Sequence, residues 1–168
     1  KGESKNRSLQ VVETFRKIEN FLFPLLEEQE KILHIKELNE EMEQQDFDSN
    51  TAKIKTVFNF WAIKNWIKRK ALPYSKNHIA TVCLQPKENL KEKLKKRHEL
   101  AKFFIEFLFE KSNQDISEKD AEKEEILVEF SVHELKEAYE KSPNLFKLDI
   151  NIDDIEDTLF YLSRIEAI

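Results

Sequence analysis

The sequence predicts a mostly α-helical protein with small antiparallel β-hairpins, that is, an α+β fold. Apolar residues recur every three or four positions over most of its 168 residues, and three short stretches alternate instead. The hydrophobic fraction is 40%, and only one glycine is present. A chain of this length and composition can bury an apolar core as one domain or two small ones, so we do not expect disorder.

The stretch before residue 50 is predicted to hold two helices and a strand. Its elements are a frayed polar start at 1–8, a helix at 9–31, a short edge strand at 32–35 and a second helix at 36–45. Pro24 lacks a backbone N–H and should kink or split the first helix near Asn20. A turn is expected at 46–50, where Ser49 or Asn50 can cap the helix that follows.

A helix that runs into a hairpin is predicted over the segment from Thr51 to Gln85. It comprises a third helix at about 50–65, strands at 66–72 and 78–84, and a turn at 73–77. Apolar residues lie on both sides of the third helix, which predicts packing on two faces. The order helix, strand, helix, helix, strand, wing, strand is that of a winged-helix module, so we expect one at 9–86.

The second half of the chain predicts a less complete copy of the same arrangement at 87–168. Its elements are a long first helix at 87–111, a mobile charged linker at 112–124, a strand at 125–130, a helix at 132–142 and a last helix at 152–164. Ser131 with Glu134 predicts a capping box at the start of the 132–142 helix.

Similar residues recur between the two halves at an offset that grows from 86 to 97 to 101. At the offset of 101, for example, Ile54 corresponds to Ile155. We therefore expect tandem winged-helix modules. The chain starts at Lys1 and ends at Ile168 within an apolar pattern. This predicts a fragment whose second module is truncated before its wing and would continue into a strand from about Ile165.

Charge is distributed unevenly along the chain. Residues 51–111 carry fifteen basic and five acidic groups, whereas residues 1–50 sum to −5 and residues 112–168 sum to −10. Between Thr51 and Gln85 there are seven lysines or arginines and no carboxylate. A basic surface attracts phosphates and an acidic one repels them, so the segment 51–85 is the predicted nucleic-acid interface.

The candidate nucleic-acid-binding residues are the basic and aromatic side chains of the third helix and the hairpin. They are Lys53, Lys55, Lys68, Arg69, Lys70, Tyr74 and Lys76. Lysines in the first turns of a groove-reading helix and on a hairpin can contact phosphates, and Tyr74 at the wing tip can stack on a base. The alternative is that the lysines only solubilise the module and Tyr74 is an ordinary turn aromatic.

The sequence supplies no motif for catalysis or metal binding. A single glycine excludes the glycine-rich loops that hold nucleotide phosphates, and a single cysteine, Cys83, excludes a disulfide framework and a cysteine-based zinc site. The four histidines are not at metal-ligand spacing. We therefore expect no catalytic residue, metal or cofactor in this chain. Without a signal peptide or a long apolar run, we expect a cytoplasmic protein with no membrane partner.

Four stretches resemble the region beyond the motor core of large bacterial RecQ-type ATP-dependent DNA helicases. They are the sequences at 54–80, 85–112, 125–142 and 154–168, and the similarity extends over roughly 10–168. In that family the motor domains hydrolyse ATP with magnesium, and a winged-helix module engages duplex DNA and uses its wing to split strands. The resemblance implies DNA contacts from Lys53 and Lys55 and from the hairpin residues Arg69, Lys70, Tyr74 and Lys76.

Two departures from the family limit what the resemblance implies. The chain lacks the four-cysteine zinc site that many members place before the winged helix, and it lacks both ATPase motifs. The expectation is thus a non-catalytic accessory region of a DNA repair or recombination helicase, whose partners are DNA and the motor domains of the same parent chain. The alternative is a protein-docking scaffold that packs on the motor without contacting DNA.

Overall fold

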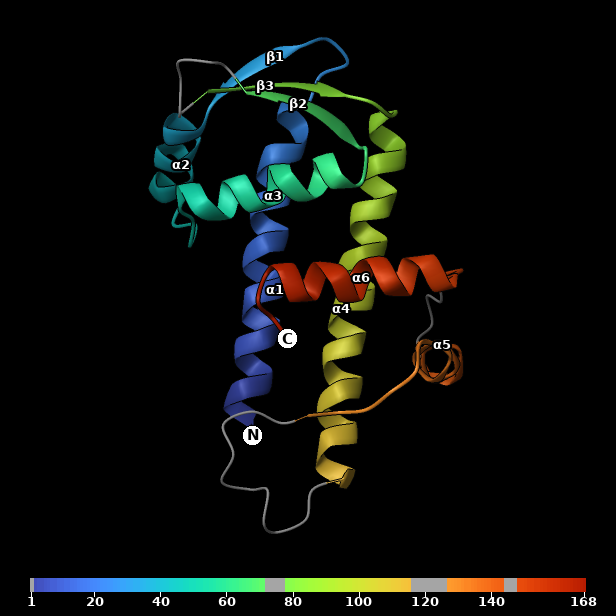
Figure 1. Ribbon diagram of the computed structural model, residues 1–168. Coiled ribbons are helices and arrows are strands. Elements are labelled where there is room, and N and C mark those ends of the chain that lie inside the picture. Colours follow the sequence, from blue (N-terminus) through green and yellow to red (C-terminus); the bar gives the residue numbers. More distant parts are fainter. Residues whose placement is uncertain (1, 72–77, 116–126, 144–147) are drawn as a thin grey trace. The chain divides into compact units, whose positions relative to one another are not determined.

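The computed structural model describes residues 2–71, 78–115, 127–143 and 148–168. These residues are mostly helical and include a three-stranded antiparallel sheet, which confirms the coarse fold class (Figure 1). The chain divides into two compact units, the sheet unit (Val11–Lys95) and the helical unit (Lys1–Gln10 with Lys96–Ile168). These bounds differ from the predicted modules at 9–86 and 87–168, because the first and the long fourth helix each contribute residues to both units.

The elements of the sheet unit follow the order that the apolar pattern predicts. They are α1 (Gly2–Leu22, from Val11 on), η1 (Phe23–Leu25), β1 (Lys31–His34), α2 (Ile35–Gln44), α3 (Thr51–Ile63), β2 (Ile67–Ala71), β3 (His78–Cys83) and the first turns of α4 (Lys87–Asp115). The strand order is β1-β3-β2, so the second hairpin strand lies between the other two. The register places Leu33 opposite Ile79, and Arg69 opposite Thr81.

Helix α1 differs from the predicted helix at both of its ends. The predicted helix at 9–31 is wrong at its C-terminal end, because α1 ends at Leu22 and Pro24 lies in the short 3₁₀ turn that follows. Proline lacks the backbone N–H that a continuing helix needs, so the break expected near Asn20 ends the helix. The prediction of a frayed start at 1–8 is wrong, because α1 begins at Gly2. These residues are polar, so the helical spacing of apolar residues that predicts a helix is absent from them. They belong to the helical unit, in which Ser4 and Ser8 line a cavity together with residues of α4.

The core of the sheet unit is built around α3. Ile54, Phe58 and Trp61 are almost completely buried, and the rings of Phe58 and Trp61 meet edge to face with centroids 5.8 Å apart. Phe60 on the other side of the helix is also buried, and its ring centroid lies 6.4 Å from that of Trp66. The predicted packing of α3 on two faces is therefore observed.

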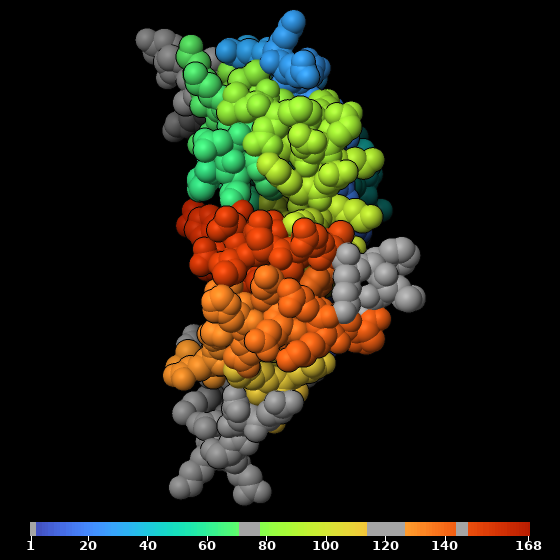
Figure 2. All heavy atoms as spheres, turned by 90° about the vertical axis from the view of Figure 1, so that its right-hand side faces the viewer, coloured from blue at the N-terminus to red at the C-terminus, as the bar shows by residue number. Residues whose placement is uncertain are grey.

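The helical unit contains the start of α1, the rest of α4, α5 (Val132–Lys141) and α6 (Ile152–Arg164). Helices α5 and α6 lie next to each other on its surface, in orange and red in Figure 2. The bounds of α6 are those predicted, and Ser131 caps α5 by accepting a hydrogen bond from the Glu134 backbone N–H at 3.1 Å. The predicted end of the long helix at 111 is wrong, because α4 continues to Asp115. Residues 112–115 of the predicted linker are thus helical, and the rest of that linker lies outside the described residues.

Two predicted strands of the second half do not form in the described residues. Residues 127–130 alternate in polarity but are not part of a strand, because the described chain supplies no partner strand for them. The predicted strand from Ile165 is replaced by a turn, in which Ala167 N donates to Leu162 O at 2.9 Å. Polarity alternation favours an extended backbone, whereas a strand also needs a neighbour.

Two helices of the sheet unit recur in the helical unit at the offsets seen in the sequence. Helices α2 and α5 each have 10 residues and start 97 positions apart, at Ile35 and Val132. Helices α3 and α6 each have 13 residues and start 101 positions apart, at Thr51 and Ile152. The match in both length and spacing shows that these helix pairs repeat.

The caps of α3 and α6 match as well. The side-chain oxygen of Asn50 accepts from the N–H three residues on at 2.8 Å, and that of Asn151 does the same at 2.8 Å. Past the end of each helix, Asn65 and Glu166 adopt a left-handed backbone with φ of 56° and 59°. The N–H after each then bonds a carbonyl five residues back, at 2.9 Å in both cases. The repeat therefore extends through both helix termini.

Candidate nucleic-acid interface

Strand β2 carries three consecutive basic residues along one edge of the sheet. Lys68, Arg69 and Lys70 are all exposed, and β2 pairs only with β3 among the described strands. No carboxylate in the described part of the chain forms an ion pair with any of the three. Their charge is therefore available to an external anion.

Alternation along β2 divides these basic side chains between the two faces of the sheet. The inner face is the buried one, formed by Leu33, Ile67, Ile79 and Thr81. Arg69, opposite Thr81, belongs to that face and projects from its margin, whereas Lys68 and Lys70 lie on the outer face. The edge strand therefore presents positive charge in two directions.

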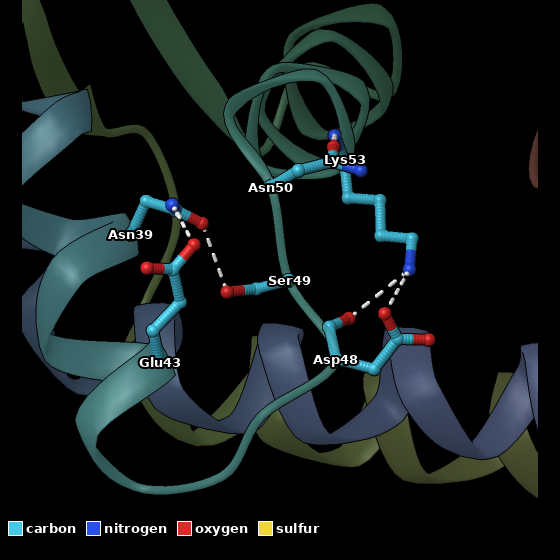
Figure 3. A network of polar contacts seen from close by, with 6 residues as sticks. All are labelled: Asn39, Glu43, Asp48, Ser49, Asn50 and Lys53. Atoms are coloured by element: carbon cyan, nitrogen blue, oxygen red, sulfur yellow. Dashed lines mark hydrogen bonds and ion pairs between the residues drawn. The ribbon is translucent and has the colours of Figure 1, made fainter.

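Lys53 lies at the start of α3 and is held by the loop that precedes the helix (Figure 3). Its ammonium lies 2.9 Å from a carboxylate oxygen of Asp48 and donates to the Asp48 backbone oxygen at 3.1 Å. Its backbone N–H donates to the side chain of Asn50, which caps the helix. In the same loop, the Ser49 hydroxyl donates to Asn39 of α2 at 2.9 Å. These bonds fix the first turn of α3 against α2.

The structure describes five of the seven predicted binding residues. Lys55 is exposed on α3, Lys53 is half-buried in its ion pair, and the three residues of β2 are exposed. Tyr74 and Lys76 lie outside the described residues, so their roles at the wing stay predictions. The basic residues of the interface thus come from two elements of the same unit, the start of α3 and the edge strand β2.

Sequence reasoning missed a pair of histidines on the outer face of the sheet. His34 at the end of β1 lies opposite His78 at the start of β3, with ring centroids 4.2 Å apart. Nδ1 of His34 accepts a hydrogen bond from Glu37 N at 3.2 Å and so caps α2. The two residues are far apart in the sequence, and only the register of β1 against β3 brings them together.

The basic residues of α4 at the start of the helical unit are less exposed than their charge suggests. The guanidinium carbon of buried Arg97 lies 3.9 Å from the ring centroid of Tyr161 in α6, a distance typical of a cation–π contact. The neighbouring Lys96 pairs with Asp154, also of α6, at 2.7 Å. Both residues fasten α4 to α6, so they contribute little to a basic surface.

The described residues contain neither a cluster that could hold a metal ion nor a helix that could span a membrane. In the stretches that the structure describes, no three His, Cys, Asp or Glu residues lie close enough together to hold a metal ion. Within those same stretches, no helix has the length and apolar content needed to cross a membrane. The one cysteine, Cys83, is buried and directs its sulfur to the Gln85 carbonyl at 3.0 Å.

Comparisons of the chain with models of protein families, with curated proteins and with solved structures find no match. A functional assignment therefore rests on the geometry and charge described above.

Proposed function

We propose that the sheet unit is a winged-helix module that binds DNA, and that the chain is a non-catalytic accessory region of a RecQ-type helicase. The element order from α1 to β3 and the strand order β1-β3-β2 support the module class. The observation that carries the DNA-binding proposal is the exposed run Lys68-Arg69-Lys70 on an edge strand. From Thr51 to Gln85 the sequence has no carboxylate to neutralise it.

Binding by these residues is directed at the phosphate backbone. A lysine ammonium contacts phosphate as a point charge, and the planar guanidinium of Arg69 can make two parallel hydrogen bonds to one phosphate. Lys55, which is exposed on α3, adds a positive charge from a second element of the same unit. Each contact releases counterions from DNA, so affinity falls steeply as salt rises.

The helical unit is proposed as the second of two tandem modules, on the strength of the repeated helices and caps. It is not proposed to bind DNA, because the exposed residues of α6 include Asp153 and Glu156, which repel phosphate. ATP and magnesium would belong to motor domains of the parent protein. DNA binding is therefore assigned to the sheet unit alone.

Charge reversal on β2 tests the proposal. The double variant Lys68→Glu with Arg69→Glu is titrated against labelled duplex DNA at low salt, beside Lys91→Glu with Lys95→Glu. The second pair changes the total charge equally and lies in exposed turns of α4. We expect the β2 variant to weaken binding by at least about tenfold and the α4 variant by far less. Absence of binding by the wild type, or equal losses in both variants, would refute the proposal.

A second candidate function is docking onto the motor domains of the parent protein. The apolar residues Phe60, Ile63 and Ile67 do not form a docking face, because Phe60 and Ile67 are buried and only Ile63 is exposed. Helix α6 offers another surface, since Ile152 and Phe160 are exposed and lie two turns apart on one stripe. Calorimetric titration with the motor core tests this candidate, and Phe160→Ser should weaken the complex while DNA affinity is unchanged.

A further inference from the structure

The outer face of the three-stranded sheet is accessible to solvent. The described helices of the sheet unit lie on the inner side, below the sheet in Figure 1. Ile32 is 57% exposed on the outer face, and Lys68 and Lys70 are exposed as well. Alternate residues of each strand form this face, which consists of Ile32, His34, Lys68, Lys70, His78, Ala80 and Val82.

Positive charge lies along one edge of this face. Lys68 and Lys70 occupy alternate positions of β2, about 7 Å apart along the strand, so each can contact a different phosphate of one nucleic-acid strand. Among the residues of the outer face, all of which the structure describes, none carries a carboxylate. Glu30 and Glu37 flank β1, which forms the opposite edge of the sheet. A phosphate backbone on this face is therefore attracted to the β2 edge and repelled from the β1 edge.

Aromatic and apolar side chains cover the part of the face that lies away from the lysines. The rings of His34 and His78 lie opposite each other with centroids 4.2 Å apart and planes inclined at 78°. In the next row the register runs from Ile32 through Ala80 to Lys70. Ala80 is itself buried, so the larger side chains on either side of it form the surface. Rings and apolar side chains accept the flat faces of bases whatever the base sequence.

The cap of α2 fixes the tautomer of one of these rings. Nδ1 of His34 accepts a hydrogen bond from Glu37 N at 3.2 Å, so this nitrogen carries no hydrogen. The hydrogen of the neutral ring is therefore on Nε2, which is a donor. A donor at Nε2 can bond to a carbonyl oxygen of a base, and the cap holds the ring in place for that contact.

We propose that the outer face of the sheet binds single-stranded DNA. The phosphates follow Lys68 and Lys70 along β2. The bases lie across the sheet, against Ile32, His34 and His78. A duplex stacks its base faces inside and presents only base edges and backbone, whereas a single strand exposes base faces to rings such as these. The inference rests on the proposed DNA binding by β2 and names the form of DNA that the outer face takes.

The experiment titrates the intact chain at low salt with a labelled oligothymidylate, which does not pair with itself, and with a labelled duplex of equal length. His34→Asn with His78→Thr removes both rings, while asparagine retains an oxygen that can cap α2 and threonine suits a strand. We expect this variant to weaken oligothymidylate binding by at least about tenfold and duplex binding by less than about twofold. His133→Asn is the matched control, because His133 is exposed on α5 of the helical unit, and it should leave both affinities unchanged.

A variant that gains affinity keeps the proposal testable if the histidine variant perturbs the fold. Ile32→Tyr adds a ring at an exposed position, and tyrosine favours strands. We expect it to tighten oligothymidylate binding by about threefold or more and to leave duplex binding unchanged. A misfolded protein would not bind more tightly, so this increase cannot arise from damage to the fold.

The results that contradict this inference differ from those that contradict the proposed function. Duplex binding without oligothymidylate binding, or oligothymidylate binding that neither the histidine variant nor Ile32→Tyr alters, would overturn the inference alone. Equal losses of both DNA forms in the histidine variant would overturn it too. Failure of the wild type to bind either form would overturn both. Displacement of the oligothymidylate by polyglutamate as effectively as by unlabelled oligothymidylate would assign the face to an acidic protein segment instead.

Discussion

The ammonium of Lys53 lies 2.9 Å from the Asp48 carboxylate, immediately ahead of α3. The pair places a negative charge beside a lysine that is proposed to approach DNA phosphate. The side chain of Asp48 is 76% exposed, so water screens the pair and its contribution to stability is small. A phosphate therefore competes with Asp48 for Lys53, and the competition can be measured.

The first prediction is that Asp48→Asn raises DNA affinity. The change frees the Lys53 ammonium and removes a like charge from the path of the phosphate, so we expect tightening by roughly two- to tenfold at low salt. Fluorescence anisotropy with labelled duplex measures it. Asp46→Asn is the matched control, since Asp46 is exposed in the same loop and asparagine tolerates its left-handed backbone. Equal effects of both variants would contradict a specific role for the ion pair.

The second prediction concerns the salt dependence of binding. If Lys70 contacts one phosphate, Lys70→Ala should reduce the slope of log K against log salt by about 0.9. The slope is obtained from titrations at several salt concentrations. Lys91→Ala provides the control, because Lys91 is exposed on α4 and is not placed at the interface. A slope unchanged in Lys70→Ala would remove Lys70 from the proposed interface.

Apolar periodicity predicted α2, α5 and α6 well because each of these helices buries one continuous stripe. Helix α6 starts and ends at the predicted residues, and the repeat of α2 and α3 in α5 and α6 was visible from spacing alone. The start of α1 was missed because residues 2–8 are polar, although they belong to the helical unit together with residues distant in sequence. The strand predicted at 125–130 does not form in its described part, 127–130, because no other described strand pairs with these residues.

The candidate site was predictable only in part. Residue type alone located the exposed run at Lys68 on β2. It could not show that Lys53 is paired with Asp48, because that bond depends on the path of the loop before α3. Nor could it show that Arg97 is buried against an aromatic ring of α6. Charge counts along a sequence therefore overstate the basic surface wherever a cation fastens one helix to another.

The third prediction concerns the cap of α6. Asn151 accepts from the Asp154 N–H, and the Asp154 carboxylate in turn accepts from the Asn151 N–H at 3.0 Å. Asn151→Ala should therefore lower the free energy of unfolding by about 1 kcal/mol, measured by urea denaturation. Asn151→Ser retains a capping oxygen and should cost much less. An equal loss in the two variants would mean that the side-chain oxygen does not stabilise the helix.

The fourth prediction concerns the core of the sheet unit. Phe58 is fully buried against Trp61, so Phe58→Ala should lower the free energy of unfolding by about 3–5 kcal/mol. Ile63→Ala on the same helix removes an exposed side chain and should change it by less than about 0.5 kcal/mol. Denaturant unfolding followed by tryptophan fluorescence reports the transition. Comparable losses in both variants would contradict the assignment of the α3 core face.

The fifth prediction concerns the pH dependence of stability in the helical unit. Lys111 Nζ donates to Glu134 at 2.6 Å, and this hydrogen bond lowers the pKa of Glu134 below its ordinary value of 4.5. The folded state thus favours the ionised carboxylate. The resulting stabilisation is fully present above about pH 4.5 and is lost as the pH falls through the lowered pKa.

Thermal melts of Glu134→Gln across this range test the fifth prediction. The variant should have a lower Tm than the wild type at neutral pH, and the difference should shrink as the pH falls below 4.5, because the wild type then loses the same charge. Glu137→Gln in the same helix is the control. Its pair with Lys141, at 3.2 Å, is more exposed on both sides, so solvent weakens it and we expect a smaller change. A Tm difference for Glu134→Gln that stays constant with pH would show that the carboxylate acts through packing and not through its charge.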